Sequence, residues 1–281
     1  MKEYSPFREF LKKFLRRKTA VVAFIFILIM FFVALFGREI APYDPRAFDY
    51  SNTLSPPTAS NWFGTDEFGR DIFSRVLAGA RLSLSVSLSA VTFAAFFGTI
   101  LGLVSGYAGG TFDNIIMRIC DVMFSFPDII LAIGIVAILG PGLQNVIIAV
   151  AVFGVPTFAR IMRGAMLALK QSLYVEAARS IGVKSSRIIF VHIFPGALSA
   201  LLVNYSMRIG TAILAAASLS FLGLGARPTD EEWGAMLSVG RNYLGTAPHA
   251  VLFPGLAILL TVLAFNLLGD GLRDALDPKY K

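Results

Sequence analysis

Several ingredients of soluble enzymes are scarce or missing in this 281-residue sequence. Charged residues make up 15% of the chain, whereas about a quarter is usual in soluble domains. Cysteine occurs once, as Cys120, so neither a disulfide framework nor a cysteine zinc site can form within the chain. The sequence has no glycine-rich phosphate-binding loop, no nucleophile elbow and no HExxH pair, so we expect no catalytic site and no bound metal.

Long apolar runs are what the sequence has instead, with 56% hydrophobic residues and a mean hydropathy of +0.70. A membrane-spanning helix needs about 20 apolar residues in a row, whereas a membrane β-strand alternates over about ten. The runs are continuous rather than alternating, which favours helices. We therefore predict an all-α integral membrane protein with six transmembrane helices, at residues 19–36, 80–106, 117–139, 143–168, 197–223 and 249–269.

Two of these runs carry further signals. Basic residues precede 19–36, as in a cleaved signal peptide, but the run is too long for one and GREIAPYD shows no small-residue cleavage pattern. We therefore expect a retained span. In the second run, Gly98, Gly102 and Gly106 recur at four-residue spacing, which predicts close approach of another helix, although membrane helices also tolerate glycine without such a role.

The distribution of Lys and Arg predicts the orientation in the membrane. If the N-terminus is cytoplasmic, the inside segments hold seventeen of the 25 Lys and Arg residues and the outside segments six. Because positive charges resist translocation, both termini are expected to be cytoplasmic. Basic residues at a bilayer surface contact anionic lipid, so the net charge of +7 does not require a nucleic-acid partner.

A charged segment on the predicted cytoplasmic side, YVEAARSIGVKSSRIIFVHIFP at 174–195, separates two apolar runs. Its first part has one helical face of small and apolar residues, flanked by Glu176 and Arg179. The residues of that face are Tyr174, Ala177, Ala178 and Ile181. Such a face needs a partner that its own chain does not obviously supply, unless the segment simply lies on the lipid headgroups.

The rest of this segment predicts a turn and a second short helix. Gly182 is suited to the left-handed conformation that ends a helix. Ser185 or Ser186 can cap the next helix, which carries His192 and runs toward Pro195. The segment is therefore expected to form a helical hairpin that protrudes from the membrane.

The same segment resembles the EAA loop of ABC importer permeases. The match consists of EAA at 176–178, then Gly182, His192 and Pro195 at the family's spacing. In that family the loop is a coupling helix that sits in a groove of a cytoplasmic ATPase. The resemblance thus implies ATPase contact for Tyr174, Glu176, Ala177, Ala178, Arg179, Ile181, Gly182, His192 and Pro195.

Other fragments are similar to the dipeptide, oligopeptide and nickel branch of that family, specifically to its C-type permease. They are WFGTDEFGRDIFSR, LGPGLQNVIIA, SLSFLGLG, EWGAML and FPGLAILLTVLAFNLLGDGLRDALDP. The resemblance implies a type I ABC importer transmembrane domain in a prokaryotic plasma membrane. It also implies four partners: a B-type permease, two ATPases that bind ATP and Mg, and an extracytoplasmic binding protein.

The implied function is import of dipeptides or oligopeptides by alternating access, with no catalysis in this chain. Nickel chelates, oligosaccharides and antimicrobial peptides stay open as cargo, and an ATP-independent channel or secondary transporter is the remote alternative. Three regions are expected: a cytoplasmic tail, first helix and outer loop at 1–79, a five-helix permease core at 80–271, and a cytoplasmic tail at 272–281.

The predicted outer segment, 37–78, has two interpretations. Trp62 and Phe63 suit an interfacial anchor, and Glu67, Arg70, Asp71 and Arg75 have the spacing of a salt-bridged helix along the membrane surface. The alternative is docking of the binding protein. The candidates for docking are Trp62, Asp66, Glu67, Arg70, Asp230, Glu231 and Glu232.

Three residues inside predicted spans are candidates for the translocation path. Arg208 lies in the fifth span and Asp128 in the third, and charges inside spans usually face a cavity or a partner. Ala216 is about two turns from Arg208, in LAAASLSFLGLG, where resembling chains usually read LAEASLSFLGLG. We predict that this face lines the path and that Arg208 favours carboxylate-bearing cargo; alternatively, Arg208 pairs with Asp128 or reaches the inner interface.

Overall fold

The computed structural model describes residues 6–276, and its regular elements there are helices, apart from one isolated bridge between Thr65 and Asp71. In chain order the helices are α1 (Pro6–Arg16), α2 (Lys18–Phe36), η1 (Tyr50–Asn52), α3 (Ile72–Ala108), α4 (Gly110–Phe124), α5 (Asp128–Leu139), α6 (Leu143–Leu169), α7 (Leu173–Ser180), α8 (Ser185–Arg187), η2 (Ile188–Ile193), α9 (Phe194–Phe221), α10 (Trp233–Gly240), η3 (Arg241–Tyr243) and α11 (His249–Leu276). The prediction of an all-α membrane fold is confirmed.

Five stretches of the described chain are long and apolar enough to cross a membrane: α2, α3, α6, the continuous Ser185–Phe221 and α11. The third predicted span, 117–139, is wrong as a single helix, because α4 and α5 meet there at a bend of 94°. Pro127 lies at the bend, where it lacks an N–H and keeps Phe126 out of the helical conformation. Counting this bent pair as one span gives six.

Helices α3 and α6 pack most closely, through the glycine stripe of α3. A Cβ placed on Gly98 would lie 2.6 Å from the carbonyl oxygen of Val155, and one on Gly102 would collide with the backbone of Ala159 in α6. Glycine therefore lets the two backbones approach in a way that alanine would not. The prediction of close helix approach at this stripe is confirmed.

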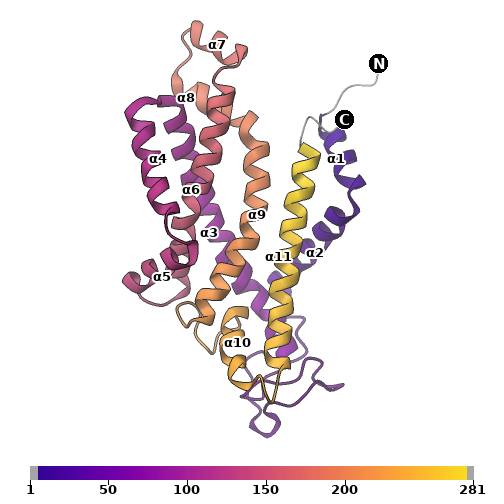
Figure 1. Ribbon diagram of the computed structural model, residues 1–281. Helices are drawn as coiled ribbons and strands as arrows, with labels where there is room; N and C mark the ends of the chain where they lie inside the picture. Colours follow the sequence, from indigo (N-terminus) through magenta and orange to yellow (C-terminus); the bar gives the residue numbers. More distant parts are fainter. Residues whose placement is uncertain (1–5, 277–281) are drawn as a thin grey trace.

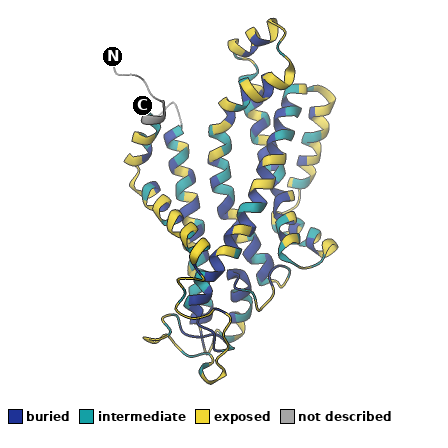
Figure 2. Cartoon of the chain, turned by 180° about the vertical axis from the view of Figure 1, so that it is seen from behind, coloured by how far each residue is buried: buried dark blue, intermediate teal, exposed yellow. Residues whose placement is uncertain are grey.

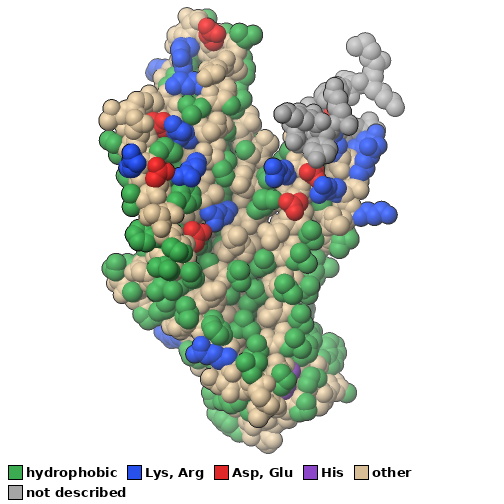
Figure 3. Space-filling view, in the orientation of Figure 1, with side chains coloured by type: hydrophobic (Ala, Val, Ile, Leu, Met, Phe, Trp, Pro, Cys, Tyr) green, Lys and Arg blue, Asp and Glu red, His purple; other side chains and the backbone are tan. Residues whose placement is uncertain are grey.

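The molecule has two different ends (Figure 1). At one end lie α7 and α8, together with α1 and the last turns of α11; at the other lie α10 and the irregular segment 37–71. Between them, apolar side chains cover the surface, for example Val22 and Leu35 of α2, which are 66% and 68% exposed (Figure 3). Such an apolar belt is what a bilayer requires of the helices that face it.

Candidate functional site

The predicted hairpin is formed by α7, α8 and η2, and one side of it is anchored to the spans. Val175 and Ala178 of α7 are 0% and 7% exposed. They belong to an apolar cluster whose other buried members are Leu103, Met162, Met166, Ile188, Ile189, Ile193 and Ala197. Because Leu103 is in α3 and both methionines are in α6, the hairpin is fixed to the two most closely packed helices.

The opposite side of α7 is exposed (Figure 2), and the side chains there include apolar ones. Leu173, Tyr174 and Ile181 are 83%, 48% and 80% exposed, and Ala177 between them is also exposed. Ala178 was predicted on this face and instead packs inward, in the apolar cluster between the hairpin and the spans, while Leu173 takes a place on the exposed face. We call Leu173, Tyr174, Ala177 and Ile181 the outer face of α7.

The turn after α7 has the predicted glycine stop. Gly182 has a φ of +75°, and its N–H donates to the carbonyl oxygen of Arg179 at 3.0 Å. The N–H of Val183 donates to the carbonyl oxygen of Ala178 at 3.1 Å, which completes a Schellman motif. Glu176 and Arg179 are exposed on the flanks, as predicted.

The predicted serine cap of the second helix is wrong. Lys184 is the residue before α8, and it makes no side-chain cap; Ser185 is already helical, and its hydroxyl accepts from the Tyr107 hydroxyl at 3.2 Å. The extended residue in the cap position, with φ −58° and ψ 140°, is Lys184, one position before the first serine. His192 is half-buried in the π-helical turn η2, and Pro195 lies in the first turn of α9.

Tyr107, at the end of α3, is a residue of this site that the sequence pattern did not reveal. Its carbonyl oxygen accepts from Lys170 Nζ at 2.6 Å, and the Arg179 guanidinium lies 5.6 Å from its ring centroid. Tyr107 therefore contacts both helices of the hairpin, α7 through Arg179 and α8 through Ser185. These contacts join residues more than 60 positions apart in the chain, and local spacing carries no signal for them.

The ionisable candidates inside the spans form a pair. Arg208 Nη1 lies 3.5 Å from Asp128 Oδ2, and its Nη2 donates to the hydroxyl of Thr157. The alternative that Arg208 pairs with Asp128 is therefore confirmed. Ala216 is 5% exposed and packed in the main apolar core, so it does not line an open surface here.

At the other end of the molecule, the predicted surface helix through Glu67, Arg70 and Arg75 is wrong. Gly69 has a φ of +73°, which interrupts any helix at that position. Helix α3 begins only at Ile72. Asp71 caps it, with its Oδ2 accepting from the Ser74 N–H at 2.8 Å. Arg70 nevertheless forms ion pairs with residues three and four positions before it, Glu67 and Asp66, in a folded turn rather than in a helix.

That turn holds a buried ion cluster. Arg70 Nε donates to Asp66 Oδ2 at 2.7 Å and Arg70 Nη2 to Glu67 Oε1 at 3.0 Å, with Arg70 and Asp66 only 2% and 6% exposed. Arg75 Nε lies 3.4 Å from the same Asp66 oxygen. Burial, followed by the neighbouring Asp66, raises the pKa of Glu67 above its ordinary value.

Two neighbouring glutamates complete this end. Glu231 is 1% exposed and accepts from Arg46 Nε at 2.7 Å and from Arg38 Nη2 at 3.0 Å. Burial alone would raise the pKa of Glu231, but the hydrogen bonds from Arg46 and Arg38, with their charges, lower it below the ordinary value.

Glu232 differs from its neighbour. It caps α10 by accepting from the N–H groups of Gly234 and Ala235 at 3.0 and 2.9 Å, and within the described residues 6–276 it has no arginine partner. Burial raises its pKa in spite of these hydrogen bonds. The side chains of Asp66, Arg70, Glu231 and Glu232 thus make their contacts inside the protein, which favours the structural interpretation over docking for these four residues.

The other docking candidates are more accessible. Trp62 is 61% exposed, Glu67 and Asp230 are half-buried, and the Asp230 carboxylate accepts from the Arg227 N–H at 2.9 Å. The half-buried Phe63 stacks on Phe253 at 3.8 Å between ring centroids, so it anchors the segment to α11.

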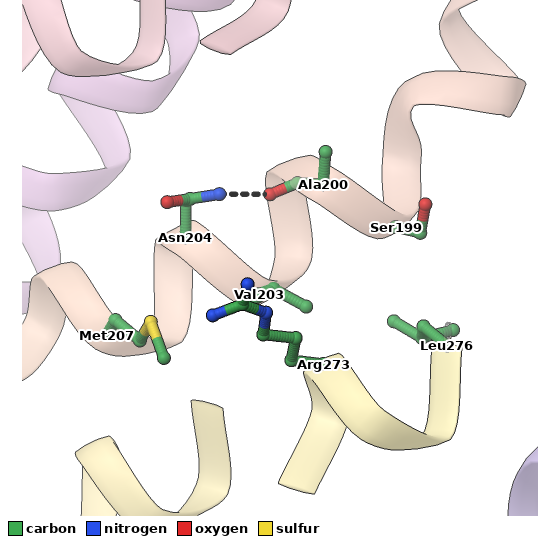
Figure 4. Close-up of a pocket in the computed structure, with 7 residues that line it drawn as sticks. All are labelled: Ser199, Ala200, Val203, Asn204, Met207, Arg273 and Leu276. Carbon is green, nitrogen blue, oxygen red and sulfur yellow. Dashed lines mark hydrogen bonds between the residues drawn. The ribbon is translucent and has the colours of Figure 1, made fainter. Parts of the chain in front are cut away.

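A cleft of about 450 Å³ opens between α9 and α11 at the end that carries α7. In it, Arg273 extends from α11 toward Val203 and Asn204 of α9 (Figure 4). The Asn204 amide donates to the Ala200 carbonyl oxygen at 2.8 Å, within its own helix. The lining residues are Ser199, Ala200, Val203, Asn204, Met207, Arg273 and Leu276.

Comparison with known protein families agrees with this geometry. The family model described as "Binding-protein-dependent transport system inner membrane component" matches residues 98–281, and the "N-terminal TM domain of oligopeptide transport permease C" matches residues 5–57. The chain belongs to this permease family. It is a non-catalytic membrane component of an ABC importer and works together with ATPase subunits.

Individual relatives extend the match over almost the whole chain. The glutathione transport system permease protein GsiD of Pectobacterium atrosepticum is 54% identical over 278 residues, covering 99% of this chain and 92% of that protein. The protein of the same name from Escherichia coli O6:K15:H31 is 56% identical with the same coverage.

The fold also matches a solved transporter. A chain of the MetNI methionine ABC transporter, in an inward-facing conformation, superposes with a TM-score of 0.60 at 20% identity, covering 72% of this chain and 97% of that one. The predicted type I ABC importer fold is thereby confirmed.

Proposed function

We propose that this permease is the C-type subunit of a heterodimer with a B-type permease, and that it imports small peptides of the glutathione kind. The support for the cargo is that relatives 54–56% identical over 99% of the chain are glutathione permeases. Two ATPase subunits and an extracytoplasmic binding protein would complete the assembly. Nickel chelates and oligosaccharides are the alternative cargos to be tested.

The observation that carries this proposal is the outer face of α7. Four apolar or small side chains, three of them 48–83% exposed, stand on a helix whose other side is fixed to α3 and α6. Exposed apolar faces on a protruding element mark protein contacts, and an amphipathic helix in a groove is one recurring form of contact. We assign the groove to an ATPase subunit, with Glu176 at the edge of the contact.

The mechanism follows from this anchoring. If nucleotide-driven closure of the ATPases moves α7, the apolar cluster transmits the movement to α3 and α6 as one body, because closely packed helices shift together rather than deform. Tilting of this body against the partner permease would exchange an inward-facing for an outward-facing cavity. In this scheme α7 and both chain termini are cytoplasmic.

The opposite end, with 37–71 and α10, would then be extracytoplasmic and receive the binding protein. Trp62, which is 61% exposed, is the candidate contact there. The division into regions 1–79, 80–271 and 272–281 is likewise proposed. Helix α3 runs through residue 80 without a break, and residues 1–5 and 277–281 of the two tails lie outside the described residues.

Transport in proteoliposomes tests the proposal. The chain is reconstituted with its partner permease, ATPases and binding protein, and uptake of glutathione is compared with uptake of a nickel chelate and of an oligosaccharide. ATP-dependent uptake of glutathione is the expected result. Uptake without ATP, or of the nickel chelate or oligosaccharide alone, would overturn the proposal.

A further inference from the structure

Three ion pairs connect the bent helix pair α4 and α5 to its neighbours, and charged side chains gather over this side of the molecule (Figure 3). Asp113 pairs with Arg163, Asp121 with Arg160, and Asp128 with Arg208. The first two pairs are short, at 2.6 and 2.7 Å, whereas the third has one contact at 3.5 Å.

The third pair is also built differently. Asp128 is the first residue of α5, directly after the 94° bend, and its side chain is 51% exposed. Arg208 is 18% exposed and is held by Thr157 of α6, independently of Asp128. Asp121 is equally exposed, at 53%, but its contact is short, and its partner Arg160 is itself 53% exposed and held by both Asp121 and the ring of Phe124, whose centroid is 4.3 Å away. The third pair therefore has a fixed cation and a half-exposed, weakly held anion.

The position of the Asp128–Arg208 pair indicates that one side of it faces a polar environment. A half-exposed carboxylate within a membrane-spanning region is very costly against lipid, and such residues face water-filled cavities or polar partners. Breaks in membrane helices are likewise tolerated where they line a cavity, and they recur at substrate sites. The side of the α4–α5 bend that bears Asp128 therefore borders the translocation path.

Resting on the proposed function, we propose that Arg208 and Asp128 form a subsite for a zwitterionic amino-acid group of a small peptide, in which an ammonium and a carboxylate lie on the same carbon and so match two side chains 3.5 Å apart. The Arg208 guanidinium takes a carboxylate of the cargo, and Asp128 takes its ammonium group. A guanidinium suits a carboxylate because it offers two parallel N–H donors. The peptide replaces one long contact with two charge-assisted hydrogen bonds, and Thr157 keeps Arg208 in place.

Charge balance selects this class of cargo. An anionic cargo on Arg208 would leave Asp128 without its partner and repelled, and a cationic cargo on Asp128 would do the same to Arg208. A zwitterionic group satisfies both side chains at once, so neither Arg208 nor Asp128 is left unpaired. Glutathione offers such a group in its γ-glutamyl residue, which carries an ammonium and a carboxylate on the same carbon.

The test is the ratio of transport rates between matched cargos in the reconstituted transporter. The cargos are glutathione, glutathione amidated at the α-carboxylate of its γ-glutamyl residue, and glutathione acetylated at its amino group. Arg208→Gln is expected to reduce the preference for the free carboxylate over the amide by about tenfold, and Asp128→Asn the preference for the free amine over the acetylated form by a similar factor. Arg208→Lys should retain much of the first preference.

Asp121→Asn, at the short pair one step away, is the matched control and should change neither ratio. If Arg208→Gln and Asp128→Asn slow all three cargos equally, or if Asp121→Asn changes the two ratios as much as they do, the pair is structural and the subsite proposal is overturned. That result leaves ATP-dependent glutathione uptake intact, whereas absence of uptake in the unsubstituted transporter overturns the proposed function itself.

Discussion

The two ends of the molecule are held together in different ways. At the end with α10, the side chains of Asp66, Arg70, Arg75, Glu231 and Glu232 are all buried, and they join 37–71 to α3 and to the segment before α10. At the end with α7, the buried cluster under the hairpin is apolar, the polar contacts of Tyr107 supplement it, and the charged side chains of α7 stay on the surface. Buried ions demand a fixed geometry, whereas an apolar anchor leaves one helix face free for a partner.

This difference indicates that the end with α10 is rigid, whereas the end with α7 can move with a partner. An ion network loses much of its value when one member moves, because the others are left unpaired in a low dielectric. An apolar cluster such as that under α7 keeps its contacts as it moves with α3 and α6. Substitutions in the ion cluster should therefore lower the stability of the protein, whereas substitutions on the outer face of α7 should lower transport.

The largest loss of stability is expected at the ion cluster. Arg70→Met leaves the buried Asp66 carboxylate without its main partner and should lower the free energy of unfolding by about 3–5 kcal/mol. The measurement is the thermal unfolding midpoint of the detergent-solubilised protein. Lys13→Gln, which removes the partly exposed pair with Glu9, is the control and should cost at most about 0.5 kcal/mol. Equal effects would contradict a rigid, ion-held end.

The next effect separates the two sides of α7 by using adjacent alanines. Ala178→Glu puts a carboxylate into the apolar cluster and should destabilise the protein by about 2–3 kcal/mol. Ala177→Glu lies on the outer face and should change stability by no more than about 0.5 kcal/mol, while abolishing ATP-driven uptake. The unfolding midpoint and the uptake rate are measured for both variants. Full uptake by Ala177→Glu would contradict the outer face of α7 as the docking surface.

The adjacent alanines also show where sequence analysis of this site stops. The hairpin and its glycine stop at Gly182 were predictable, because each depends on residue type and local spacing. The pairing of Arg208 with Asp128 was one of the alternatives, because charges inside spans need a partner, but the spacing of the two residues did not select it. Which sector of α7 faces its own chain was not, since periodicity gives the angles between residues but not the direction of the rest of the protein.

The fold shows the same limit. Apolar runs located the spans, but the helix expected through Arg70 was wrong because Gly69 adopts a positive φ, which an i, i+3, i+4 charge spacing does not reveal. The 94° bend at Pro127 was hidden in the same way inside a run of sufficient length for one span. Contacts such as those of Tyr107 depend on tertiary packing and appear only in the structure.

The smallest predicted effect compares two adjacent glutamates. The lowered pKa of Glu231 means that its contribution to stability is present above pH 4.5, its ordinary value, and is lost as the pH falls through the folded-state pKa. The raised pKa of Glu232 means the opposite: its contribution is present below pH 4.5 and is lost as the pH rises through the folded-state pKa.

Glu231→Gln should therefore flatten the loss of stability in acid, and Glu232→Gln should flatten the loss on the other side of pH 4.5. The unfolding midpoint measured across this range checks both. The same pH profile for the two variants would show that the arginines do not distinguish the two carboxylates.

Site-specific crosslinking at α7 tests the central claim most directly. Cys120, the chain's one native cysteine, is buried at 3% exposure, so a cysteine introduced at Ala177 or Ala178 can be labelled selectively. In native membrane vesicles, Ala177→Cys should crosslink to an ATPase subunit, with a yield that changes when ATP is added, and Ala178→Cys should not. An ATPase crosslink at Ala178→Cys alone, or none at Ala177→Cys, would contradict the account of α7 as the helix that couples the ATPases to the membrane.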